Sequence, residues 1–170
     1  TSNLRVLSRN ISINKLEEKI KINQLPLTKD QNQYLLFEES EFIEGHAENA
    51  FGAETDSEEQ VIQSKNRYKI FGTNINYLIK NNILSIPNYI KIDVDGIEHL
   101  ILEGASDYLD NSEIRSMSIE LNENFKDQVN SVLKIMDKSN FRFKHKKHAS
   151  MFNNSDKFSK IFNYIFEKQK

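Results

Sequence analysis

Three acidic residues lie close together where a β-prone stretch gives way to a helix. The segment reads Ile90-Lys91-Ile92-Asp93-Val94-Asp95-Gly96-Ile97-Glu98. A hydrophobic strand brings Asp93 to its carboxyl end, Asp95 follows in the turn, and Glu98 falls in the first turn of the next helix. Ligands of open α/β sheets bind beyond the carboxyl ends of the strands. Asp93 is therefore the leading candidate, because a carboxylate at the tip of a buried strand needs a partner or a chemical role.

Carboxylates gathered at one strand end suit proton transfer. If Asp93, Asp95 and Glu98 lie close together, their like charges raise the pKa of at least one of them, which favours a general base. Asp95 and Glu98 also have a structural explanation. The N-terminus of a helix stabilises nearby carboxylates by roughly 0.3–1 kcal/mol each.

The segment Asp93-Val94-Asp95 supports a second interpretation. Metal-dependent glycosyltransferases use an Asp-x-Asp pair to hold Mg²⁺ or Mn²⁺ against the diphosphate of a nucleotide-sugar. The spacing is short and common by chance. Transfer of sugar from a nucleotide-sugar that requires added metal would favour this alternative. Apart from this alternative, we assign no metal ligand in the chain.

The composition is that of a single globular domain spanning residues 1–170. The chain has 170 residues, of which 28% are charged and 38% apolar, with a formal net charge of −2 and no cysteine. Disulfides, thiolate zinc sites and cysteine nucleophiles are therefore excluded. No apolar run is long enough to span a bilayer, and the overall charge does not favour nucleic acid. We expect a cytoplasmic protein, and the oligomeric state is left open.

The spacing of apolar residues predicts the helices and strands that position the acidic segment. The pattern predicts a helix over 3–14, strands over 20–27 and 34–37, and a solvated acidic loop over 38–60. Downstream, apolar stripes predict helices and strands in alternation. They are a strand at 68–71, a helix at 74–84 capped by Asn74, a strand at 89–94, a helix at 97–105, a strand at 114–121, a helix at 125–136, and strands at 141–147 and 161–166.

This order predicts an α/β fold with a mainly parallel sheet covered by helices. No helical pattern separates the last two strands, so we expect them to form an antiparallel hairpin at a sheet edge. Lys144-His145-Lys146-Lys147-His148 lies on the first of them. We interpret this basic cluster as a solvated edge strand protected by lysines, and not as a nucleic-acid site.

The acidic segment, followed by Leu-Ile-Leu-Glu-Gly-Ala, resembles the signature of the FkbM family of S-adenosylmethionine-dependent methyltransferases. That family typically shows Ile-Lys-Ile-Asp-Val-Glu-Gly-x-Glu and a Gly-Ala after the helix. Three weaker matches fall in the same order along the chain. They are the helix ending at Asn14, the pair Ile75-Asn76, and the closing segment Phe162-Asn163-Tyr164-Ile165-Phe166.

The resemblance implies a Rossmann-like class I fold, S-adenosylmethionine as the methyl donor, and O-methylation of a sugar or another small-molecule hydroxyl. It implies Asp93 as the general base or as a hydrogen-bond acceptor for the hydroxyl, with Asp95 and Glu98 assisting. Leu27 and Thr28 fall where related folds meet the adenine, and Asp93 is grouped with them as a cofactor residue. Glu120 and Gly96 are assigned to the acceptor side.

The chain also departs from the family pattern. Asp95 replaces the usual Glu, Asn76 replaces the usual Asp, and no Gly-x-Gly occurs anywhere. The acidic residue that usually holds the ribose hydroxyls is missing as well. We therefore expect the sequence to begin after the second strand of the fold and to bind S-adenosylmethionine poorly by itself. The alternative that is not an enzyme is a non-catalytic fragment with a methyltransferase-like fold.

Overall fold

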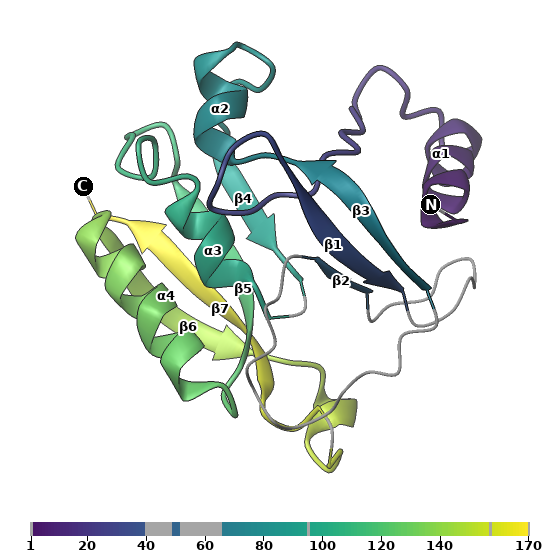
Figure 1. Ribbon diagram of the computed structural model, residues 1–170. Coiled ribbons are helices and arrows are strands. Elements are labelled where there is room, and N and C mark those ends of the chain that lie inside the picture. Colours follow the sequence, from purple (N-terminus) through teal and green to yellow (C-terminus); the bar gives the residue numbers. More distant parts are fainter. Residues whose placement is uncertain (1, 40–48, 52–65, 95, 157, 170) are drawn as a thin grey trace. The chain divides into compact units, whose positions relative to one another are not determined.

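The computed structural model describes residues 2–39, 49–51, 66–94, 96–156 and 158–169. The chain divides into two compact units, and Figure 1 labels the helices and strands. The first unit comprises Thr1–Pro26 and Tyr34–Phe71, and the second comprises Leu27–Gln33 and Gly72–Lys170. The single domain expected over residues 1–170 stays a prediction.

The first unit holds a helix and a small sheet. Helix α1 spans Ser2–Ile13, as predicted. Three strands pair in the order β2-β1-β3, and their bounds are Gln33–Glu39 for β1, Asn49–Phe51 for β2 and Asn66–Gly72 for β3. β1 and β3 match the predicted strands, and Tyr34 packs edge-on against Phe71 with ring centroids 5.4 Å apart. β2 falls inside the predicted acidic loop, most of which lies outside the described residues.

The strand predicted over 20–27 is wrong. Only Leu27 makes a strand-like contact there, an isolated parallel bridge to Thr73. Ile20 and Ile22, whose alternation suggested the strand, are 40% and 37% exposed. An alternating pattern produces a strand only where a neighbouring strand supplies hydrogen bonds, and no described strand pairs with this segment.

The second unit is built on a four-stranded sheet in the order β4-β5-β7-β6. The strands span Tyr89–Ile92 for β4, Ser116–Asn122 for β5, Phe141–Lys147 for β6 and Ile161–Lys168 for β7. β4 and β5 are parallel, whereas β7 is antiparallel to both β5 and β6. The predicted hairpin at the sheet edge is confirmed. The predicted predominance of parallel pairing is not found among these strands, because β7 returns beside β5.

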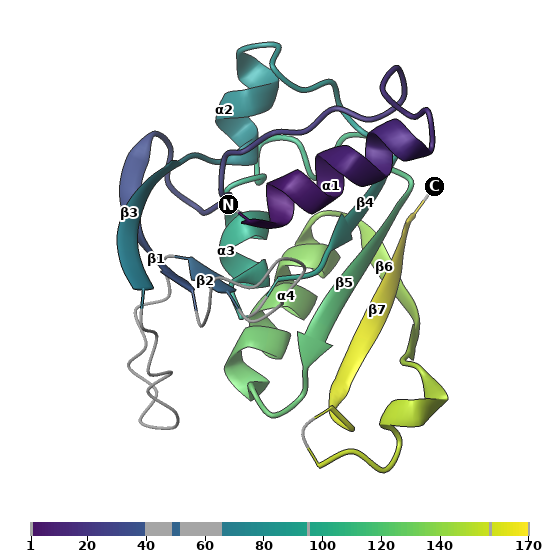
Figure 2. The ribbon, with the colours of Figure 1, turned by 90° about the vertical axis from the view of Figure 1, so that its right-hand side faces the viewer.

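Helices α3 and α4 cover one face of this sheet (Figures 1 and 2). They span Glu98–Glu103 and Lys126–Lys138, and the shorter α2 spans Ile75–Lys80. A single 3-10 turn, Ser150–Phe152, lies between β6 and β7. Alternate residues of β5 face the helices, so that Met117, Ile119 and Leu121 are almost fully buried. The predicted helix at 74–84 is shorter than expected, because Asn81 ends it and Asn82 follows with a positive φ of 58°.

The end of α3 packs directly on the segment 27–33. A Cβ atom added to Gly104 would lie 2.2 Å from the carbonyl oxygen of Thr28 and 2.8 Å from Cβ of Asn74. Asn74 caps α2 by accepting a bond from Tyr77 N–H at 2.8 Å, and its amide donates to the carbonyl of Lys29 at 2.8 Å. Only glycine allows this close approach of two backbones.

The outer strand β6 is held by charged pairs. Lys144 donates to both carboxylate oxygens of Glu167 on β7, at 2.6 and 2.7 Å. Lys146 forms an ion pair with Glu123, and the Tyr164 hydroxyl donates to the same Oε1 at 2.5 Å. The bond from Lys146, followed by that from Tyr164, holds the pKa of Glu123 below its ordinary value. Burial, followed by the bond to Glu123, raises the pKa of Tyr164.

Replacing Gly104 should destabilise the second unit. We expect Gly104→Ala to lower the free energy of unfolding by about 2–3 kcal/mol, because the backbone of Thr28 must move to admit a methyl group. Glu103→Ala, on the exposed side of the same helix, is the control and should change stability by less than about 0.5 kcal/mol. Urea unfolding followed by circular dichroism measures both. Equal stability of Gly104→Ala and the wild type would contradict the close approach.

The Glu123 cluster should make stability depend on pH. Because the pKa of Glu123 is lower in the folded chain than its ordinary value of 4.5, its contribution is present at neutral pH and is lost as pH falls through the folded value. Glu123→Gln should cost about 1 kcal/mol at pH 7, and this difference from the wild type should shrink below pH 4.5. Urea unfolding at pH 7 and pH 3.5 tests this. A difference that stays constant with pH would contradict it.

Candidate active site at the carboxyl end of β4

Parallel pairing carries Asp93 to a shared strand edge. Tyr89 and Lys91 are exposed and Ile92 is buried, so β4 alternates between the two faces of the sheet. Ile92 is paired with Ile119 of β5. The next residues along the two strands are Asp93 and Glu120, and this register therefore brings their carboxyl groups together.

Asp93 is an ionised, partly exposed carboxylate. Its side chain is 44% exposed and forms an ion pair with Lys91. The hydrogen bond from Lys91 is the main reason that the pKa of Asp93 is lowered. Burial acts in the opposite direction, and a hydrogen bond with Glu120 lowers the pKa further. Like charges were predicted to raise the pKa of at least one of the three acids, but the pKa of Asp93 is lowered because Lys91 donates to it. A carboxylate of this kind is better suited to accept a hydrogen bond than to act as a strong base at neutral pH.

Glu120 connects Asp93 to strand β7. Its half-buried side chain accepts a bond from the Asn163 amide at 3.4 Å, and Asn163 in turn accepts a bond from the Ser118 hydroxyl at 3.4 Å. Glu120 was predicted on the acceptor side, whereas the contact of Asn163 with it was not foreseen. The available signal was a polar residue between Phe162 and Tyr164 on a strand rich in aromatic residues.

Glu98 faces the interior. It is 2% exposed, and its Oε2 accepts a bond from the Gln128 amide of α4. Its Oε1 accepts a bond from the Gly96 N–H at 3.4 Å, and Gly96 itself has a φ of +100°, which favours glycine. Glu98 therefore connects the turn after β4 to α4. Asp95 lies outside the described residues.

The residues predicted for the cofactor lie near the two ends of α3. Thr28 is buried and contacts Gly104, immediately after the C-terminal end of α3, and its N–H donates to the Thr73 carbonyl at 3.0 Å. Leu27 forms the parallel bridge beside it. Asp93 precedes the N-terminal end of the same helix. Leu27 and Thr28 therefore lie near one end of α3 and Asp93 precedes its other end, and the assignment of all three to the cofactor stays a prediction.

Asn76, which replaces the usual Asp of the family, has a structural role. Its Oδ1 accepts a bond from the Asp107 N–H at 3.2 Å, and its own N–H donates to the Gly104 carbonyl at 2.9 Å. The side-chain amide also donates to the Ser106 hydroxyl at 3.4 Å. These bonds fasten α2 to the turn after α3, and an amide can make them without a negative charge.

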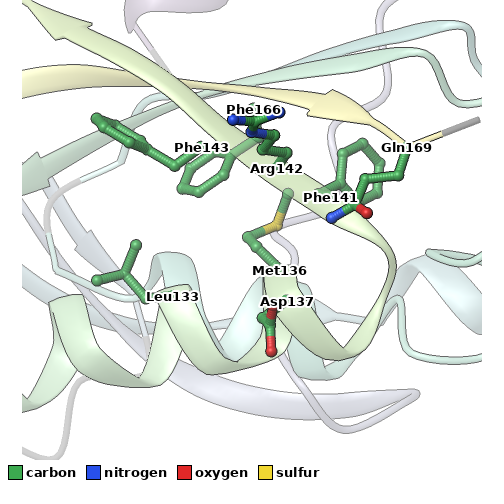
Figure 3. Close-up of a pocket in the computed structure, with 8 residues that line it drawn as sticks. All are labelled: Leu133, Met136, Asp137, Phe141, Arg142, Phe143, Phe166 and Gln169. Atoms are coloured by element: carbon green, nitrogen blue, oxygen red, sulfur yellow. The ribbon is translucent and has the colours of Figure 1, made fainter.

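A hollow of about 290 Å³ lies elsewhere, between α4 and β6 (Figure 3). Apolar side chains, including Leu133, Met136 and Phe143, line much of it, and none of the predicted site residues does so. Within the described ranges, no group of three or more His, Asp or Glu side chains could hold a metal ion. None of the helices in the described part of the chain has the length and apolar character needed to cross a bilayer.

The fold and this polar strand edge are consistent with a methyltransferase-like α/β protein. The family model described as "Methyltransferase FkbM domain" matches residues 2–157. The chain therefore belongs to the FkbM methyltransferase family, as the signature segment indicated. No curated protein and no solved structure gives a significant match.

The bond between Glu98 and Gln128 should contribute measurably to stability. Gln128→Ala removes the amide that meets a buried carboxylate, and we expect it to lower the free energy of unfolding by about 1–3 kcal/mol. Asn130→Ala, on the exposed side of the same helix, is the control and should change stability by less than about 0.5 kcal/mol. Chemical denaturation compares the two. Equal effects of the two substitutions would show that this bond does not hold α3 to α4.

Proposed function

We propose that this chain belongs to an S-adenosylmethionine-dependent O-methyltransferase and provides the side of the active site that receives the acceptor hydroxyl. Family membership implies the reaction class and the usual donor. The observation that carries the proposal further is the ionised carboxylate of Asp93, held by Lys91 beside Glu120 at the carboxyl end of β4. Sugars and other polyols are the acceptors that such a polar edge suits, because their hydroxyl groups donate well to carboxylates.

Asp93 would act on the acceptor hydroxyl. S-adenosylmethionine supplies an electrophilic methyl group when it is bound. The contribution of this chain is to accept a hydrogen bond from the acceptor O–H at the Asp93 carboxylate, which orients the oxygen for attack. A hydroxyl becomes far more acidic as its oxygen forms a new bond to carbon. A carboxylate with a lowered pKa is then sufficient to take the proton.

The other predicted residues have supporting roles in this proposal. Glu120 borders Asp93 and would meet a second polar group of the acceptor. Gly96 and Glu98 hold the turn that follows Asp93. Asp95 stays a predicted helper. The cofactor contacts of Leu27 and Thr28 stay predictions.

Loss of the Asp93 charge should impair methyl transfer. In the full-length gene product, we expect Asp93→Asn to lower kcat by about 10²–10⁴-fold, because the amide can neither accept the proton nor orient the hydroxyl in the same way. The measurement is transfer of radiolabelled methyl groups from S-adenosylmethionine to a panel of sugars and other hydroxyl compounds. Asp137→Asn, an exposed residue of α4, is the matched control and should behave like the wild type.

Two results would contradict this proposal. The first is a folded Asp93→Asn variant with normal methyl transfer, which would remove the role of Asp93. The second is a wild-type protein that methylates no hydroxyl compound but transfers sugar from a nucleotide-sugar in the presence of Mg²⁺ or Mn²⁺. That result would favour the glycosyltransferase alternative.

A further inference from the structure

Strand β6 forms one edge of the four-stranded sheet. It pairs with β7 on one side, and no described strand pairs with its other side. Alternate residues of such a strand direct their backbone N–H and C=O groups outward, where another extended chain can bond to them. β6 is seven residues long, and every residue after Phe141 is exposed. The strand is therefore long and accessible enough to accept an added strand.

The two rows of side chains on β6 differ in character. Phe143 is paired with the buried Phe166 and faces α4. On the opposite face, polar and cationic side chains follow one another in spite of a register shift after Phe143. They are Arg142, His145 and Lys147. One face of the outer strand is therefore apolar near its beginning, and the other is basic along its length.

Two cations of β6 are not neutralised by the described residues. Lys144 and Lys146 each form an ion pair with a glutamate. Arg142 and Lys147 form no ion pair within the described part of the chain. Antiparallel pairing of β6 with the β6 of a second copy would place cations opposite cations, which is destabilising. The same charges attract a strand that carries carboxylates.

The hollow of about 290 Å³ adjoins this edge on the side of the helices (Figure 3). Leu133 and Met136 of α4 line it together with the beginning of β6. Leu133 and Phe143 are 37% and 43% exposed, although both are apolar. An apolar side chain of an added strand would cover these two residues. Because side chains alternate along a strand, the next residue of that strand would project to the face that carries Arg142 and Lys147.

We propose that the outward edge of β6, Phe141–Lys147, and the adjoining hollow form a docking edge for an extended partner segment in which acidic and apolar residues alternate. The segment adds to the sheet as an outer strand, and its backbone bonds to that of β6. Its carboxylates lie on the side of Arg142 and Lys147, and its apolar residues lie over Phe143 and in the hollow. This docking edge is independent of the proposed methyl transfer.

An acidic polypeptide fits the docking edge better than a nucleic acid does. Both are negatively charged, but only a polypeptide strand continues the backbone bonding of β6 and places an apolar side chain in the hollow. A single-stranded nucleic acid stacks its bases on aromatic rings. The ring of Phe143 already contacts the rings of Tyr164 and Phe166, with centroids 5.5 and 5.9 Å apart. The net charge of −2 gives the chain no general attraction for a polyanion.

A synthetic peptide tests the docking edge on the full chain. The probe is a fluorescein-labelled peptide of alternating glutamate and valine, and its fluorescence anisotropy reports binding. We expect saturable binding with a Kd of about 10–100 µM, which weakens by about 5-fold in high salt because the salt screens the charges. Hydrogen exchange of the complex should show new protection of the β6 amides. A matched probe with lysine in place of glutamate should not bind.

Substitutions on the two faces of the docking edge locate the probe. Lys147→Glu replaces attraction by repulsion, and Leu133→Glu places a carboxylate in the hollow that the apolar residue enters. We expect each to weaken binding of the acidic probe by about 10-fold or more. Lys80→Glu, at an exposed position of α2, is the matched charge reversal and should leave the Kd unchanged. Circular dichroism confirms that each variant is folded.

Several results would overturn the docking edge. One is the lack of saturable binding at about 1 mM probe, and another is a Kd that folded Lys147→Glu and Leu133→Glu leave unchanged. Protection of amides elsewhere than in β6 would place the probe at a different surface. An oligothymidylate that binds more tightly than the peptide, with the same loss in Lys147→Glu, would assign the edge to nucleic acid. Self-association that protects the β6 amides without any peptide would assign it to a second copy.

Discussion

The parallel pairing of β4 with β5 is the constraint on which the candidate site depends. With Ile92 opposite Ile119, the two strands bury their apolar residues against α3 and α4 and turn the alternate residues to the other face. A slip of one residue would bury Lys91 and expose Ile92, at a large cost in free energy. The same hydrophobic register therefore determines that Asp93 meets Glu120, and the chemistry of the site follows from the packing of the core.

Lys91 favours the ionised form of the Asp93 carboxyl group. Carboxyl groups that meet without a nearby cation compete for a proton, and one of them becomes a base near neutrality. Here the ammonium group two residues earlier on the same strand lies on the same side and favours the ionised form of Asp93. The result is a charged carboxylate at Asp93, beside the carboxyl group of Glu120.

Sequence patterns predicted the local elements well and the long-range pairings less well. The apolar stripe of Val132 and Met136 and the β-prone run before Asp93 each carry their own signal, and both elements are present. The alternation of Ile20 and Ile22 carried a similar signal, but no described strand offers them a partner. The contact between Asn163 and Glu120 was not foreseen, because the two residues are 43 positions apart in the sequence. Glu98 was recognised as an acid, but its burial against Gln128 depends on the packing of two helices.

The path of the chain between the two units has a consequence for any attempt to dissect them. Leu27–Gln33 belongs to the second unit, although the residues on both sides of it belong to the first. The polypeptide therefore passes from one unit to the other three times. A single proteolytic nick after Phe71 would place Thr28 and Lys29, which contact Gly104, on the N-terminal piece, whereas Gly104 lies on the C-terminal one. A gene divided at this point would encode a C-terminal fragment without Leu27–Gln33, the segment that completes the second unit.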